Sequence, residues 1–257
     1  MKRRDIIAAS AGIAGGLVSG LARSAVPCPP SPVTVAGGGS ATTACVASGA
    51  SYSTTFNLTE NPISESGSWI NGGSVGLSWQ NVRTSGGVAC GVGPSAGYDD
   101  CIACLRSTAG INSVAHSAQG TIYKAAGYAA PSSHEVGLYV GRNISAGVAT
   151  GYEVNFQFGT SVQFVRWNGA LGDFDVLSPT GSGYVAANGD QPVVTFRIVG
   201  GNPVITLSVG GVQKLTYTDS SAKKIVSGQP GMGFFARSGA GLDMTKYCLT
   251  GFSAASI

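Results

Sequence analysis

The chain has 257 residues, of which 40 are glycine and only 11% are charged. This length suits one large domain with its own core. Abundant glycine without a triplet repeat argues against helical and collagen-like proteins. It favours many short strands joined by tight turns.

The first 25 residues are typical of an export signal. A basic start with Arg3 and Arg4 precedes a mildly apolar, glycine-rich segment, and small residues offer cleavage after Ala22 or Ala25. The segment is short and weakly hydrophobic for a membrane span. It resembles a twin-arginine signal peptide, with an ordinary secretory signal as the alternative. We therefore predict that residues 1–25 are removed and that the protein is exported, to the periplasm or the extracellular space.

Signal removal changes the charge balance of the protein. The whole chain has 15 basic and 12 acidic residues. The signal contains four of the basic and one of the acidic residues, so eleven of each remain. A neutral domain lacks the basic surface that nucleic-acid binding needs, so we expect no nucleic-acid partner.

All cysteines lie after the predicted signal. They are Cys28, Cys45, Cys90, Cys101, Cys104 and Cys248. An even number in an exported chain predicts disulfides and no free thiol, with the pairing open. A zinc site of Cys90, Cys101, Cys104 and His116 is the alternative. It is disfavoured because strand positions three apart, such as Cys101 and Cys104, face opposite sides.

The remaining chain divides into an arm and one domain. Residues 26–50 are rich in Pro, Gly, Ser and Thr, which predicts a linker or irregular N-terminal arm. Residues 51–257 contain about a dozen short apolar runs separated by turn signals, and no sustained helical periodicity. The expected strands are 51–57, 75–82, 98–106, 117–125, 135–142, 151–158, 162–168, 174–178, 192–200, 203–210, 213–219, 232–238 and 246–254. So many strands in one domain predict an all-β fold, either a two-sheet antiparallel sandwich or a barrel.

Pairing of apolar with apolar residues suggests the register of two hairpins. With residues 159–161 as the turn, Phe156 would face Phe164 and Glu153 would face Trp167. The same reasoning pairs Phe196 with Leu207, Thr195 with Ser208 and Arg197 with Thr206. In each hairpin one face is then core and the other is polar.

Several segments together resemble a known superfamily. They are WINGGSVGLSWQNV, YDDCIACL, GYEVNFQF, VQFVRWNGALGDFDVL, ITLSVGGVQKLTYTD and GQPGMGFF. They are similar to the concanavalin A-like lectin and glucanase superfamily, in its LamG-like jelly-roll branch, over residues 51–255. The resemblance implies a jelly-roll sandwich of two curved antiparallel sheets. Members bind sugars, hydrolyse glucans, or serve as adhesion and particle-attachment modules.

No catalytic motif stands out. A retaining glucanase needs two closely spaced carboxylates, and the family places them on one strand as Glu-x-Asp-x-x-Glu or a close variant. None of the four glutamates, Glu60, Glu65, Glu135 and Glu153, has a second carboxylate two or four residues away. Asp173 and Asp175 flank a turn and are interpreted as turn and cap residues, and no lyase motif surrounds His116 or His134. We therefore expect no catalytic residue.

Calcium is the one cofactor that the residues leave open. Related sandwiches hold it with aspartates and backbone carbonyls in loops, and the chain has loop-like aspartates at Asp99, Asp100, Asp173, Asp190 and Asp243. They do not form a dense acidic loop. We therefore predict no metal ligands.

Trp167 offers the clearest hint of a ligand. Aromatic rings stack on the apolar faces of sugars, while amides and charges bind their hydroxyls. The predicted carbohydrate site consists of Trp167, Arg166, Asn155, Gln157, Gln163 and Glu153. The competing interpretation is that a loop or the other sheet covers Trp167.

The sequence therefore predicts an exported carbohydrate-binding or glycan-binding protein without catalytic activity. One alternative is a glycan hydrolase or polysaccharide lyase with an unrecognised site. Another is a structural or adhesion module of an appendage, envelope or particle. The sequence does not determine the oligomeric state.

Overall fold

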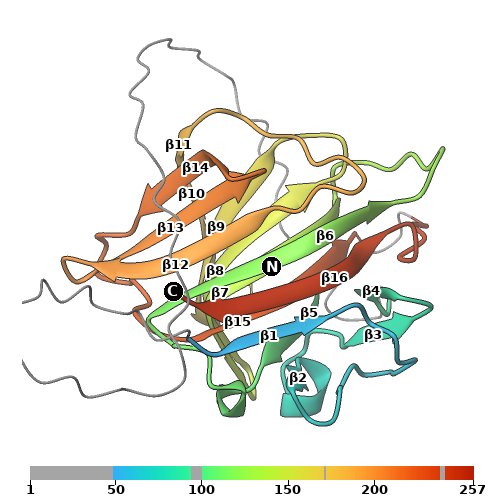
Figure 1. The fold of residues 1–257 in the computed structure, drawn as a ribbon, viewed down its shortest axis with the longest axis horizontal. Coiled ribbons are helices and arrows are strands. Elements are labelled where there is room, and N and C mark those ends of the chain that lie inside the picture. Colours follow the sequence, from blue (N-terminus) through green and yellow to red (C-terminus); the bar gives the residue numbers. More distant parts are fainter. Residues whose placement is uncertain (1–48, 94–99, 171, 238–240) are drawn as a thin grey trace, which may run out of the picture. The chain divides into compact units, whose positions relative to one another are not determined.

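The computed structural model describes residues 49–93, 100–170, 172–237 and 241–257 (Figure 1). The predicted signal peptide and nearly all of the predicted arm lie outside these residues. The described part is two antiparallel sheets packed face to face, which confirms the predicted all-β sandwich. No helix in the described part is long and apolar enough to cross a membrane.

One sheet has nine strands in the order β11-β14-β13-β12-β6-β16-β4-β3, with β1 also paired to β16. Its strands are β1 (Ser51–Thr54), β3 (Val82–Ser85), β4 (Val88–Gly91), β6 (Ala115–Lys124), β11 (Thr180–Gly181), β12 (Val193–Val199), β13 (Asn202–Val209), β14 (Val212–Thr218) and β16 (Tyr247–Ser256). In Figure 1 this sheet faces the viewer, with β6 and β16 near its centre.

The other sheet has seven strands in the order β10-β9-β8-β7-β15-β5-β2. Its strands are β2 (Trp69–Asn71), β5 (Asp100–Leu105), β7 (His134–Ser145), β8 (Val148–Gln157), β9 (Val162–Ala170), β10 (Phe174–Leu177) and β15 (Gln229–Ala236). Two short 3₁₀ helices, η1 (Gly73–Val75) and η2 (Ser107–Ala109), complete the described elements.

The main core lies between the two sheets. Successive side chains of a strand point to opposite faces, so each strand contributes every second residue to this core. Val154, Phe156 and Phe164 of the seven-stranded sheet belong to the same buried cluster as Phe196 and Leu207 of the nine-stranded sheet. Burial of these apolar side chains is the main stabilising contribution.

Glycine pairs set the tightest hairpins. Gly200 and Gly201, between β12 and β13, both have positive φ angles, 57° and 78°. Two consecutive positive φ angles define the type I′ turn, whose twist matches that of the flanking strands. The turn makes Val199 the partner of Asn202 and thereby fixes the register of the whole hairpin.

The predicted registers are wrong by two residues in both hairpins. Phe156 pairs with Val162 rather than Phe164. Phe196 pairs with Ile205 rather than Leu207. A two-residue error preserves the faces, because side chains alternate with a period of two. The predicted division into core and outer residues is therefore kept while the individual partners change.

The region before β5 differs most from the expected strands. Residues 75–82 were expected to form a strand, but only Val82 belongs to one, while Val75 ends η1 and Gln80 forms an isolated bridge with Cys101. Strands β3 and β4 form an unexpected hairpin with Gly86 and Gly87 in its turn, both at positive φ. The Gly–Gly pair between short apolar runs is the signal that could have predicted it.

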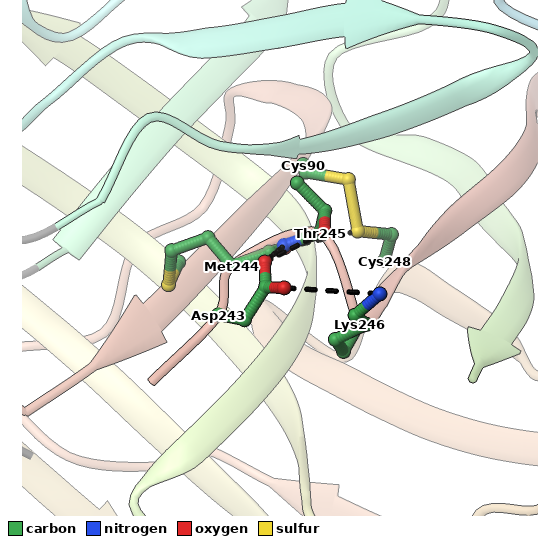
Figure 2. Close-up of a disulfide and its surroundings, with 6 residues drawn as sticks. All are labelled: Cys90, Asp243, Met244, Thr245, Lys246 and Cys248. Carbon is green, nitrogen blue, oxygen red and sulfur yellow. Dashed lines mark hydrogen bonds and ion pairs between the residues drawn. A yellow bond between two sulfur atoms is a disulfide. The ribbon is translucent and has the colours of Figure 1, made fainter. Parts of the chain in front are cut away.

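One disulfide joins Cys90 of β4 to Cys248 of β16 (Figure 2). Cys101 and Cys104 are buried thiols on opposite faces of β5, so the expectation that all cysteines form disulfides is wrong. Burial raises the pKa of the Cys104 thiol to about 12, which keeps it protonated and unreactive at neutral pH. Cys28 and Cys45 lie outside the described residues.

Candidate functional site

Trp167 lies on the outer face of the seven-stranded sheet, but it is not exposed. Its exposed fraction is 0%, so the expectation of an accessible ring is wrong. Its ring centroid lies 4.5 Å from that of Trp79 and 5.1 Å from that of Phe174. With Tyr139 and Ile102, these residues belong to a second buried cluster on this face. The competing interpretation, that another part of the chain covers Trp167, is therefore correct.

Residues 72–81, here called the covering segment, provide much of that cover. Leu77 and Trp79 of this segment are 3% and 1% exposed and pack in the same cluster as Trp167. Gly72 N–H donates to the Ile102 carbonyl, and the Gln80 carbonyl accepts from Ile102 N–H. The segment is thus held to the edge of the sheet by backbone hydrogen bonds, in addition to apolar packing.

Arg142 fills a cage of aromatic rings beneath the covering segment. Its guanidinium carbon lies 4.8 Å from the Trp79 centroid, 4.7 Å from that of Tyr139 and 5.3 Å from that of Trp167. Arg142 is 1% exposed, and its guanidinium nitrogens have no hydrogen-bond partner within the described part of the chain. Burial lowers the pKa of Arg142 from its ordinary value. The cation–π contacts and the negative charges of Glu153 and Asp100 stabilise the charged guanidinium.

A β-bulge in β7 turns Arg142 to this face. Val140 pairs with Tyr152 and Asn143 with Thr150, so Gly141 and Arg142 share a place in the β7–β8 ladder. Gly141 has a φ of 57°, and a side chain on it would point into the ring of Phe196. Gly141 therefore faces the main core, and Arg142 faces outward.

His116 of β6 holds the bulge from the opposite sheet. Its Nε2 accepts from Gly141 N–H at 3.1 Å, while its Nδ1 lies 2.7 Å from the Asn112 carbonyl oxygen. The ring is therefore neutral, with its proton on Nδ1 directed at Asn112. Burial lowers the pKa of His116 to about 4, which is consistent with this structural role.

Polar side chains of β7, β8 and β9 form hydrogen bonds on the same outer face. The buried Glu153 accepts from Trp167 Nε1 at 2.8 Å. Asn155 donates to Gln163 Oε1 at 3.3 Å, and Gln157 donates to Glu135 Oε1 at 3.3 Å. Gln157 and Gln163 are half-buried, whereas Asn155 is fully buried. We call Asn155, Gln157 and Gln163 the amide row.

The structure therefore brings together five of the six predicted site residues. The exception is Arg166, which points to the other side of β9. Its Nη1 donates to Asp219 at 2.7 Å, and its Nη2 pairs with Asp175. Asp219 also accepts from Tyr152 at 2.7 Å. Burial raises the pKa of Asp219, but hydrogen bonds from Arg166, Ser221 and Tyr152 outweigh this and hold it below its ordinary value. Arg166 therefore has a structural role: its ion pair with Asp219 joins β9 to the residue that follows β14.

Three of the aspartates considered for calcium lie in turns or loops, but Asp100 is a buried residue of β5, so its expected loop position is wrong. Asp190 accepts from Ala187 N–H at 2.8 Å, and Asp243 accepts from Thr245 N–H at 2.9 Å (Figure 2). Asp173 accepts from Asn168 Nδ2 at 3.1 Å. In the described ranges no three His, Cys, Asp or Glu side chains gather at one place. Asp99 lies outside these ranges.

Comparison with known proteins gives similarity of fold. No protein-family model matches the chain, and no curated protein matches it in sequence. The structure is similar to that of the GH43 protein BlXynB of Bacillus licheniformis, with a TM-score of 0.50 and 10% identity over 80% of this chain and 39% of that one. It is also similar to carbohydrate-binding module CBM66 of Bacillus subtilis (TM-score 0.41, 12% identity, 75% of this chain and 94% of that one). A β-glucanase of Bacillus licheniformis gives a TM-score of 0.43 and 15% identity, over 81% of this chain and 96% of that one.

At these identities the comparisons speak to the fold alone. The order and antiparallel pairing of the strands are those of a two-sheet jelly roll. The protein therefore has a two-sheet antiparallel jelly-roll fold, as predicted from the sequence.

Sequence reasoning missed Arg142 and Tyr139 as parts of this face. The signal that could have found them is the Gly141–Arg142 pair, which interrupts an otherwise regular alternation from Glu135 to Val140. A glycine at such an interruption often marks a bulge. No local pattern indicates that residues 72–81 fold over the sheet.

Proposed function

We propose that this protein is an exported, non-catalytic glycan-binding protein of the LamG-like type, with residues 1–25 as its signal peptide. The glycan would contact the outer face of the seven-stranded sheet at the amide row. Gln157 and Gln163 would contact sugar hydroxyls directly, and Asn155 would position Gln163.

The fixed orientation of two accessible amides carries this proposal. Gln157 is held by Glu135 and Gln163 by Asn155, so neither amide needs to be ordered on binding. Side chains that are ordered in advance lose less entropy when they bind a ligand.

Trp167 and Glu153 support the row in this proposal and do not contact the sugar. The Trp167 indole fixes the Glu153 carboxylate two residues before Asn155 on β8. Arg166 has no part in binding, because its guanidinium is engaged with Asp175 and Asp219.

Screening of the mature chain on a glycan array, followed by calorimetric titration, tests the proposal. Q157A/Q163A should weaken binding by at least tenfold, as loss of central contacts typically does. The matched control is Q119A/Q191A, a hydrogen-bonded glutamine pair formed by β6 and the loop before β12, which should bind within twofold of wild type. Absence of binding on the array would contradict the proposal. Release of reducing sugar from a bound glycan would instead favour the hydrolase alternative.

A further inference from the structure

A shallow, solvent-open depression of about 420 Å³ lies beside β1, on the nine-stranded sheet. Its walls come from Tyr52 and Thr54 of β1, from Asn57 and Leu58 after it, and from the turn at Glu65 and Ser66. Pockets for small ligands span about 300–1,000 Å³, so this depression is large enough to contact one sugar residue. We call it the β1 pocket.

Strained backbone surrounds the β1 pocket. Within the described residues, only Phe56, Glu65 and Ser66 combine a positive φ with a side chain, at 56°, 44° and 61°. Glu65 and Ser66 line the pocket, and Phe56 lies between residues that do. Such conformations cost free energy and persist only where the surroundings impose them, which happens most often at ligand sites. Here Phe56 is anchored in the core, and Glu60 accepts from the N–H groups of Ser64 and Glu65.

The Glu65 carboxylate is fixed in the pocket wall. It accepts from the hydroxyls of Tyr52 and Thr54, and from Trp69 Nε1 at 3.0 Å. Burial and the bond to Glu65 together raise the pKa of Tyr52, so its hydroxyl remains a donor. A carboxylate already surrounded by N–H and O–H donors has little capacity left for a metal cation.

The remaining lining matches a neutral sugar. Leu58 is 51% exposed and Tyr52 is half-buried, so both can contact the apolar face of a sugar ring. Asn57 and Ser66 offer donors and acceptors for hydroxyls. The lining includes no lysine, arginine or histidine, while Glu65 brings a negative charge, which disfavours acidic sugars.

We propose that the β1 pocket is a second glycan subsite, selective for an uncharged sugar residue and separate from the amide row. The choice of a sugar rests on the proposed function. The two sites belong to different sheets, so each can be altered without the other.

Titration of ¹⁵N-labelled mature protein with cellotetraose, laminaritetraose and xylotetraose, followed by NMR, tests this proposal. At least one of these neutral probes should shift the amide signals of residues 52–58 and 64–66. N57A/L58A should lower the affinity for that probe at least tenfold, as measured from the same amide shifts. The variant should fold normally, because both side chains are exposed. Val199→Ala, which truncates another exposed apolar residue, is the matched control and should leave the response unchanged. Trigalacturonate should bind the pocket at least tenfold more weakly than the neutral probe.

The possible failures are distinguishable. If no neutral probe shifts the pocket signals while glycans still bind at the amide row, the second subsite is wrong and the proposed function stands. Equal binding of trigalacturonate would overturn the proposed selectivity. If neither site responds to any glycan on the array, both proposals fail.

Discussion

The outer faces of the two sheets differ although their strands show similar alternation in sequence. On β6 of the nine-stranded sheet, outward residues such as Gln119 and Tyr123 are partly exposed and inward ones are buried. On β8 of the seven-stranded sheet, residues from Gly151 to Phe156 are buried on both faces. The difference teaches that alternation assigns residues to faces, while burial of an outer face depends on what packs over it.

The largest expected difference between the two outer faces is the loss of unfolding free energy when one aromatic side chain on each face is truncated. Trp167→Ala should cost about 3–5 kcal/mol of unfolding free energy, because it leaves a cavity beneath Trp79 and Phe174. Tyr123→Ala on the other sheet should cost less than about 1 kcal/mol. Urea unfolding of both variants measures the difference. Equal losses would mean that the covering segment does not bury Trp167.

The two buried arginines of the seven-stranded sheet provide a second comparison. Arg166→Met should cost about 3 kcal/mol, because it leaves the buried Asp219 without its ion-pair partner. Arg142→Met should cost about 1–2 kcal/mol, less than R166M, because the lost ring contacts and the lost attraction of Glu153 and Asp100 are partly offset by removal of a buried charge without hydrogen bonds. Urea unfolding again gives both values. A loss in R142M as large as that in R166M would show that the buried carboxylates of Glu153 and Asp100 depend on Arg142 as strongly as Asp219 depends on Arg166.

Acidification tests the connection between the sheets at His116. Burial lowers the pKa values of both His116 and His134 to about 4, below the value of about 6.5 in an unfolded chain. As pH falls, the unfolded chain therefore binds protons first. The stability contributed by the neutral rings is complete above pH 6.5 and is lost progressively toward pH 4. We expect a loss of about 2–3 kcal/mol for each histidine over this range.

Unfolding measured from pH 7.5 to 4.5 checks this expectation. His116→Leu should lower stability at pH 7.5, because Gly141 N–H loses its acceptor, and should reduce the slope toward acid. An unchanged slope in this variant would exclude His116 as a source of the acid sensitivity. The carboxylate of Asp219, with its lowered pKa, adds a separate loss at still lower pH.

Much of the fold was predictable because it depends on short-range patterns. Apolar alternation and Gly–Gly turns identified most strands and the faces of β8, β9, β12 and β13. The exact partners were not predictable, because a shift of two residues preserves every face. The covering segment was not predictable either, since the run containing Leu77 and Trp79 has the composition of a strand.

The sequence by itself determined the all-β class and the set of side chains that share the outer face of β8 and β9. These follow from the period of two and from turn chemistry, which act over a few residues. Only the tertiary structure decided that Trp167 is buried, that Arg142 lies in its aromatic cage and that Arg166 pairs with Asp219. Each of these depends on contacts between residues far apart in the chain, and local patterns carry no information about such distant contacts.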